Sequence, residues 1–153
     1  MTIKLQLHHL QGIRTHAEST YPEECCGIVV GHLGDDGKTV VEIWATENAW
    51  SAEAADDFPR GEGEGSKRRR YAIAPGDMLK AQREARDRAM NIIGIYHSHP
   101  DHPAIPSEMD RAIAWQVYSY IIVSVPQSKA GELQSWCLDD SHQFQPEEII
   151  TEI

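Results

Sequence analysis

Two histidines one residue apart, followed by an aspartate, are the residues in this sequence most able to do chemistry. His97 and His99 stand directly after the apolar run NIIGIY, and Asp110 follows a proline-rich loop. Side chains two residues apart on a strand project to the same face, so both imidazoles can point at one atom. Zinc binds imidazole nitrogen and carboxylate oxygen, and a catalytic zinc has three protein ligands and an open fourth position. The spacing therefore predicts a zinc site with Asp110 as the third ligand.

The loop between the histidines and the aspartate is restricted. Pro100, Pro103 and Pro106 limit its backbone freedom, which lowers the entropy lost when the loop is fixed. Ser107 and Asp110 also fit the helix-start pattern S-x-x-[DE], in which the serine caps the helix and the acid lies in its first turn. A structural role and a functional role are therefore compatible at these two residues.

A site of this kind needs a group that removes a proton from water. The stretch YPEECCGIVVG offers two carboxylates for this role, Glu23 and Glu24. If the stretch enters a strand, the two glutamates point to opposite sides, so only one of them can face the site. The strand pattern by itself does not select between them.

Composition indicates one soluble domain. The chain has 153 residues, 41% of them hydrophobic, which is enough for a single core over residues 1–153. It has no run of about 18 apolar residues, and its first residues lack the basic and apolar segments of a secretory signal. We therefore expect a cytoplasmic protein that does not bind membranes. The formal net charge of −10 disfavours nucleic acid as a partner, because binding to phosphates needs clustered lysine and arginine.

The other histidines and the cysteines do not predict a second site. His102 lies in the proline loop, where a fourth protein ligand would close the open position of a catalytic metal. The histidines without a partner pattern are predicted at the surface: His8, His9, His16, His32 and His142. The three cysteines, Cys25, Cys26 and Cys137, are odd in number, so we expect reduced thiols. Cys25 and Cys26 lack a C-x-x-C spacing, so we expect these two to be small buried hydrophobes.

The first half of the chain predicts a helix, a hairpin and a loop. The helix follows from apolar residues at helical spacing, and the hairpin from two apolar runs around a turn-rich connection. Glycine, proline and acidic residues predict the loop. The elements are a helix over 8–20, a hairpin of 26–32 and 40–45 with its turn centred on Asp36 and Gly37, and a mobile acidic loop over 51–66.

The second half alternates helices with buried strands. Amphipathic spacing predicts the helices, and short continuous apolar runs predict the strands. The elements are a helix over 75–90 that buries Met78, Ala81, Ala85 and Ala89, a strand over 91–96, a helix over 107–117 that buries Met109, Ala112, Ile113 and Val117, a strand over 120–125, and a hairpin around 129–131. The alternation predicts a mixed α/β domain, with antiparallel pairing supplied by the hairpins.

One pattern in the sequence matches a known family. The run H-S-H-P, then six residues, S, two residues and D, with an upstream P-E-E-x-C-G, resembles the JAMM (MPN-plus) zinc metallopeptidases, in particular the small stand-alone bacterial members. The resemblance covers 21–31, 71–86, 94–110 and 120–125. It implies a single-domain MPN/JAMM fold, a mixed β-sheet flanked by helices with cytidine-deaminase-like architecture.

The resemblance also implies a role for each residue of the motif. It makes His97, His99 and Asp110 the zinc ligands, Glu24 the general acid/base, and Ser107 the side chain that helps to stabilise the oxyanion. Elementary chemistry agrees, because zinc acidifies water and polarises a carbonyl, a carboxylate can move a proton to a leaving amine, and a hydroxyl can donate to a developing negative oxygen.

The implied substrate is a protein. Stand-alone bacterial relatives act on ubiquitin-like sulfur-carrier proteins that end in Gly-Gly, so the resemblance implies a zinc peptidase that cuts the amide after this diglycine. Cleavage would either release cysteine for biosynthesis or trim a carrier precursor, and both outcomes stay open. The basic run Lys67, Arg68, Arg69 and Arg70 would contact an acidic carrier, and the loop 51–66 would fold over its tail.

Two other functions remain as alternatives. The chain would be a catalytically silent MPN scaffold or protein-binding module if the fold were kept without turnover. The intact set of Glu24, Ser107 and the three ligands disfavours this alternative. A zinc hydrolase of small molecules or nucleobases is disfavoured because the deaminase pattern of H-x-E with P-C-x-x-C is absent.

Overall fold

The structure is a computed structural model that describes residues 2–51 and 66–153. In this part of the chain the elements are, in order, β1 (Thr2–Gln6), α1 (Leu7–Thr20), β2 (Cys26–Gly34), β3 (Gly37–Thr46), α2 (Pro75–Asp87), β4 (Asn91–Pro100), α3 (Glu108–Ile113), β5 (Ser119–Val125), the 3-10 turn η2 (Pro126–Ser128), β6 (Leu133–Leu138) and β7 (Phe144–Glu152). The predicted loop 51–66 lies outside the described residues except at its two ends, so its mobility stays a prediction. No helix in the described ranges is long and apolar enough to cross a membrane.

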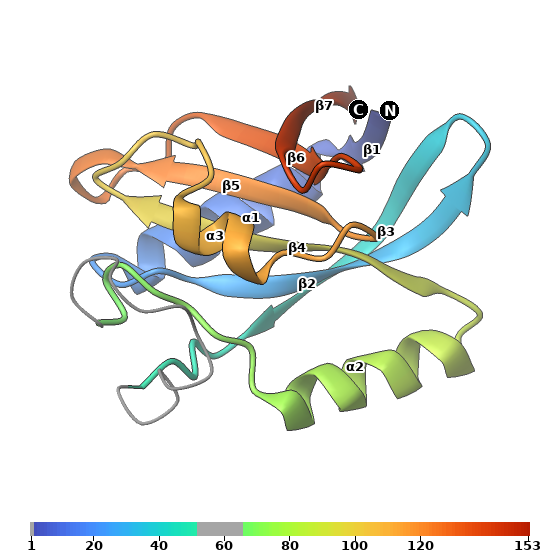
Figure 1. Ribbon diagram of the computed structural model, residues 1–153, viewed down its shortest axis with the longest axis horizontal. Helices are drawn as coiled ribbons and strands as arrows, with labels where there is room; N and C mark the ends of the chain where they lie inside the picture. Colours follow the sequence, from blue (N-terminus) through green and yellow to red (C-terminus); the bar gives the residue numbers. More distant parts are fainter. Residues whose placement is uncertain (1, 52–65) are drawn as a thin grey trace.

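The strands form one mixed sheet that closes on itself. Its order is β1-β3-β2-β4-β5-β6-β7, and β1 lies parallel to both β3 and β7. The predicted hairpins are present, because β2 pairs antiparallel with β3 and β5 pairs antiparallel with β6. β4 lies between antiparallel β2 and parallel β5 (Figure 1). The predicted α/β class is therefore confirmed, while β1, β7 and the closure of the sheet were not predicted.

Strand alternation divides the core between two faces of the sheet. α1 packs Leu10, Ile13 and Ala17 against one face. α2 packs Ala81 and Ala85 against the other face, alongside β2 and β4 (Figure 1). Both helices were predicted, and each packs on the sheet through its buried apolar residues.

The adjacent cysteines are divided between the same two faces. Cys25 lies in the cluster under α1, and Cys26 lies in the cluster under α2. Burial raises the pKa of Cys25 to about 12 and that of Cys26 to about 11, so both thiols stay protonated. The prediction that these two cysteines are buried is confirmed.

Two predicted helices are shorter than expected. α2 ends at Asp87, and Ala89 lies beyond it, exposed and with φ of 58°. α3 ends at Ile113, and the Trp115 N–H is bound by the Tyr120 hydroxyl at 2.7 Å instead of continuing the helix. The predicted inward positions of Ala89, Ala112 and Val117 are therefore wrong. Ala112 and Val117 are exposed.

Two smaller predictions also need correction. The turn of the β2–β3 hairpin is formed by Asp35 and Asp36, and Gly37 already begins β3 with φ of 138°. His9 is buried at 3% exposure, because its ring accepts a hydrogen bond from the Gln6 N–H at 3.1 Å and reaches the Val41 carbonyl at 3.0 Å. The prediction that His9 lies at the surface is therefore wrong, because His9 caps the start of α1 and is buried there.

The close pairing of β2 and β4 gives a stability test. Gly27 lies opposite Tyr96, and a Cβ at Gly27 would overlap the Tyr96 ring. Gly27→Ala should lower the free energy of unfolding by about 1–3 kcal/mol, the usual cost of overpacking a core. Chemical denaturation measures this change.

The matched control is Gly76→Ala in the first turn of α2, where a Cβ would meet nothing within 4 Å. Its unfolding free energy should stay within about 0.5 kcal/mol of the wild type. Equal effects of the two substitutions would contradict the close contact at Gly27.

Candidate metal centre

Three ligand atoms converge at one end of β4. His97 Nε2 lies 3.3 Å from His99 Nε2, and Asp110 Oδ2 lies 3.3 Å from the first nitrogen and 3.1 Å from the second. Atoms bound to one tetrahedral zinc at about 2.0–2.1 Å are about 3.3 Å apart. In the ranges that the structure describes, no other group of three such side chains comes together in this way. The donor set and its spacing therefore fit zinc.

The backbone and its hydrogen bonds hold these atoms in place. His97 and His99 lie on β4, which is paired on both sides. His99 Nδ1 lies 2.8 Å from the Pro103 carbonyl, so this nitrogen carries the proton and Nε2 keeps its lone pair for a ligand. The proline loop therefore orients a candidate ligand.

Asp110 is fixed at the start of α3. Its Oδ2 accepts the Ser107 N–H at 2.9 Å, and its own N–H donates to Ser107 Oγ at 3.0 Å. This is the capping box that the sequence predicts. The same carboxylate both caps the helix and faces the histidines.

The surroundings of Asp110 and His97 favour the forms that bind a cation, whereas those of His99 favour its protonated form. Burial acts to raise the pKa of Asp110, but His97 and His99 together hold it below its ordinary value. Burial lowers the pKa of His97, which favours its neutral form. Burial also acts to lower the pKa of His99, but the hydrogen bond and charge of Asp110 raise it. An ionised carboxylate beside neutral imidazoles is the state that metal binding requires.

Of the two candidate glutamates, only Glu24 turns toward these residues. Glu24 is 5% exposed, whereas Glu23 lies at the surface. Glu24 precedes Cys26 by two residues, and Cys26 pairs with His97 between β2 and β4. Glu24 also lines the same pocket as His99, so it lies beside the candidate ligands.

The surroundings of Glu24 shift its acidity strongly. Burial, and then the charge of Asp110, raise the pKa of Glu24 well above its ordinary value, while Arg70 opposes the shift. Two neighbouring carboxyl groups thus differ in acidity, since Asp110 is held ionised and Glu24 is pushed toward the protonated form. Such divergence is typical of acid/base sites.

A pocket of about 320 Å³ opens beside the metal centre. Its lining includes Glu24 and Ser107, the two residues of the family motif that are not candidate ligands. Arg69 and Arg70 of the basic run also line it. The lining residues are Glu24, Arg69, Arg70, His99, His102, Pro103, Ile105 and Ser107. Ser107 Oγ accepts the Asp110 N–H, so its own hydrogen is left to donate into this pocket. His102 is exposed and outside the ligand group, as expected.

A further side chain at the centre was not predicted. Tyr71 stacks on His97 with ring centroids 4.4 Å apart and an interplanar angle of 20°. It also lines an apolar pocket of about 620 Å³ between α2 and the segment after α3, where Trp115 is 68% exposed. No local pattern marks Tyr71, because the contact joins segments that are far apart in the chain.

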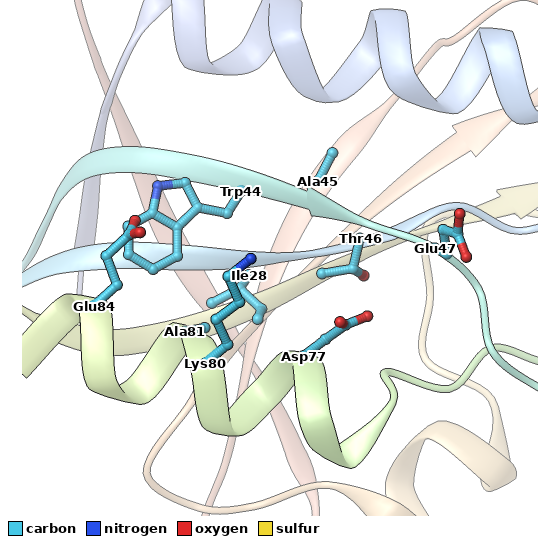
Figure 2. Close-up of a pocket in the computed structure, with 9 residues that line it drawn as sticks. All are labelled: Ile28, Trp44, Ala45, Thr46, Glu47, Asp77, Lys80, Ala81 and Glu84. Carbon is cyan, nitrogen blue, oxygen red and sulfur yellow. The ribbon is translucent and has the colours of Figure 1, made fainter.

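Another hollow, of about 540 Å³, lies between β3 and α2. Figure 2 shows Asp77, Lys80 and Glu84 of α2 on one side of it and Trp44 of β3 on the other. None of the candidate ligands, Glu24 or Ser107 lines it. It is therefore separate from the metal centre.

A family model described as prokaryotic homologs of the JAB domain matches residues 6–139. The chain belongs to this family. The metal centre, Glu24 and Ser107 all lie within the matched range of this prokaryotic JAB domain. The match confirms the resemblance to the JAMM/MPN family and its single-domain α/β fold.

Several characterised proteins resemble this prokaryotic JAB domain. A protein of Pyrococcus furiosus named desampylase is 30% identical over 54% of this chain and 56% of its own length. The tail tip assembly protein K of Escherichia phage N15 is 28% identical over 72% of this chain and 38% of its own length. The chain thus spans about half or less of these two relatives. The CysO-cysteine peptidase of Mycobacterium tuberculosis is 29% identical over 82% of this chain and 75% of its own length.

Solved structures agree with the fold. A Desulfitobacterium hafniense protein superposes with a TM-score of 0.79 at 25% identity, covering 99% of this chain and 93% of its own. A JAB1/MPN domain protein of Archaeoglobus fulgidus superposes with a TM-score of 0.54 at 17% identity, covering 98% of this chain and 99% of its own. The second likeness supports the prokaryotic JAB fold alone.

The ligand geometry predicts a zinc-affinity change. Asp110→Asn should weaken zinc binding by at least about 100-fold, the upper end of what loss of an outer partner costs a metal site. Asparagine keeps an oxygen for the Ser107 N–H but removes the charge. Competition against a chromophoric chelator measures the dissociation constant.

Asp87→Asn, at the exposed end of α2, is the matched control. Its zinc affinity should equal that of the wild type. Wild-type affinity in Asp110→Asn would exclude Asp110 as a ligand.

Proposed function

We propose that this protein is a zinc-dependent peptidase or isopeptidase that hydrolyses the amide bond after the C-terminal Gly-Gly of a ubiquitin-like sulfur-carrier protein. The observation that carries the proposal is the convergence of three ligand atoms at 3.1–3.3 Å, next to a pocket that contains both Glu24 and Ser107. A metal site that would activate water, a general base and a hydroxyl that would donate to the oxyanion then lie together.

Zinc would be held by His97, His99 and Asp110. When bound, it supplies a water of lowered pKa and polarises the scissile carbonyl. The three candidate ligand side chains are 0–9% exposed, so the surrounding protein limits access of bulk water. A water-poor site strengthens the electrostatic interactions within it.

Glu24 would be the general base and then the general acid. Its carboxylate takes a proton from the attacking water while the water oxygen bonds to the carbonyl carbon. The same proton passes to the nitrogen of the leaving amine as the C–N bond breaks. The raised pKa of Glu24 suits both steps, because a carboxyl group of ordinary acidity holds a proton too weakly at neutral pH.

Ser107 would stabilise the oxygen that becomes negative during attack. Its Oγ accepts the Asp110 N–H at 3.0 Å, which fixes the side chain and leaves its hydrogen to donate. A donor held in this way needs no reorganisation when charge develops. The capping box thereby orients the catalytic hydroxyl.

A carrier protein as the substrate is supported by the names of the relatives and by the surface around the site. Relatives are named desampylase and CysO-cysteine peptidase. Lys67, Arg68 and Arg69 are exposed, and Arg69 and Arg70 line the pocket beside Glu24. We propose that these four residues contact an acidic carrier and that the apolar pocket at Trp115 accepts part of its surface.

The first experiment is mass spectrometry of a Gly-Gly-ended carrier fused to a short C-terminal peptide. Zinc-loaded wild type should remove the peptide at the diglycine, and chelator should stop the reaction. Glu24→Gln should lower the rate by about 100-fold or more, because proton transfer contributes 10²–10⁴-fold in such sites. Wild-type turnover by Glu24→Gln would exclude its role.

Glu23→Gln is the matched control, since Glu23 is the exposed neighbour. It should cleave at the wild-type rate. A wild type that holds stoichiometric zinc and cleaves no carrier would favour the scaffold alternative, with the apolar pocket as its binding surface.

The basic run predicts a salt-dependent association rate. Replacing Lys67, Arg68, Arg69 and Arg70 by serine should slow association with an acidic carrier by about 10-fold or more at low salt, where electrostatic steering is strongest. The difference should shrink as salt rises. Stopped-flow binding at two ionic strengths measures it, and unchanged rates at low salt would remove this contact from the proposal.

A further inference from the structure

Asn48 makes four hydrogen bonds beside the metal centre. Its Nδ2 donates to the Glu24 carbonyl at 3.0 Å and to the Arg70 carbonyl at 2.9 Å. Its Oδ1 accepts the Trp50 N–H at 3.0 Å and the Ala72 N–H at 3.2 Å. All four partners are main-chain groups, so the contact does not depend on the identity of the neighbouring side chains.

The chemistry of this position calls for an amide. Two carbonyl oxygens need a donor with two hydrogens, and two N–H groups need an acceptor oxygen, which one carboxamide supplies. Aspartate would keep the acceptor but place a negative oxygen against two carbonyls. Alanine would leave four polar groups to find other partners, at a cost for each one that stays buried.

The first segment that Asn48 holds carries Glu24. This residue precedes the first residue of β2, so the ladder of the sheet does not fix its main chain. The Glu24 N–H donates to the Lys67 carbonyl at 2.7 Å, and the Glu24 carbonyl accepts from Asn48. The N–H of Glu24 is thus hydrogen-bonded to the loop that precedes α2, and its carbonyl is hydrogen-bonded to Asn48.

The second segment carries Tyr71. Asn48 binds the residues before and after it, Arg70 and Ala72, and the Tyr71 ring stacks on His97 at 4.4 Å. One side chain therefore links the base to the aromatic ring that covers a candidate ligand.

We infer that Asn48 is a positioning residue for hydrolysis, because it sets the main chain of Glu24 and of Tyr71 relative to the metal centre. The inference rests on the proposed function. Asn48 acts through Glu24 rather than through the ligands, since His97 and His99 are held by β4 and Asp110 by Ser107. Loss of Asn48 should therefore separate catalysis from metal binding.

The test compares Asn48→Asp with the wild type, both loaded with zinc. The kcat for carrier cleavage should fall by about 100-fold, the effect of a misplacement of about 1 Å at a reacting group. The zinc dissociation constant should stay within about threefold, because the strand pairing of the two histidines and the hydrogen bonds of His99 and Asp110 do not involve Asn48. Hydrogen exchange of the Glu24 amide should become faster, since the main chain that it anchors is loosened.

Asn91→Asp is the matched control. Asn91 is exposed at the start of β4, the end opposite to the histidines, and the substitution makes the same chemical change. It should leave kcat, zinc affinity and Glu24 exchange unchanged. Asn48→Ala serves as a second variant that adds no charge.

Three results would overturn the inference. The first is an unchanged kcat in both Asn48 variants while the wild type is active. The second is a loss of zinc affinity in parallel with kcat, which would make Asn48 a structural residue of the whole site. The third is unchanged Glu24 exchange, which is decisive even if no carrier is cleaved. Failure of the zinc-loaded wild type to cleave would instead count against the proposed function.

Discussion

The pairing of β4 with β2 on one side and with β5 on the other is the constraint on which the candidate site depends. His97 and His99 are two residues apart on this strand, and Cys26 of β2 lies opposite His97. A shift of one residue in this register would turn both imidazoles to the face covered by α1. Gly27 secures the pairing from the other face, where the Tyr96 ring occupies the space of a side chain. The position of the two candidate histidine ligands is thus a property of the sheet.

The site gathers polar groups that burial would otherwise disfavour. Buried polar groups are stable when they are hydrogen-bonded or paired. Asp110 satisfies this condition through Ser107 and the histidines, and His99 through the Pro103 carbonyl. Glu24 responds to the same low-dielectric surroundings with a raised pKa. The difference between the two carboxyl groups follows from their partners rather than from their chemical type.

Local patterns predicted most of what positions the ligands. Strand 91–96, the helix-start motif at Ser107 and the apolar stripes of α1 and α2 are all short-range signals. Each is present, except that Ala89 lies beyond the end of α2. The choice between Glu23 and Glu24 needed their burial and the lining of the pocket, which the sequence does not show. Tyr71 and Asn48 gave no signal, because their contacts join separate segments. β1 was missed because it has only five residues and pairs with β7 at the opposite end of the described chain. β7 has nine residues, but Glu147 is its one buried residue, so it carries no buried apolar run that would mark a strand.

Closure of the sheet by β1 and β7 bears on how the chain folds. Thr2 pairs with Glu148 and Ile3 with Ile149, the most distant pairing in the sheet. Bringing the two ends of so long a segment together costs conformational entropy before contacts between them can offset it. Non-local pairings of this kind slow folding. The β2–β3 hairpin and the β5–β6 hairpin face no such barrier. The seam between the first and last strands is therefore the pairing in this sheet with the largest loop-closure cost, on a part of the sheet that carries none of the candidate metal ligands.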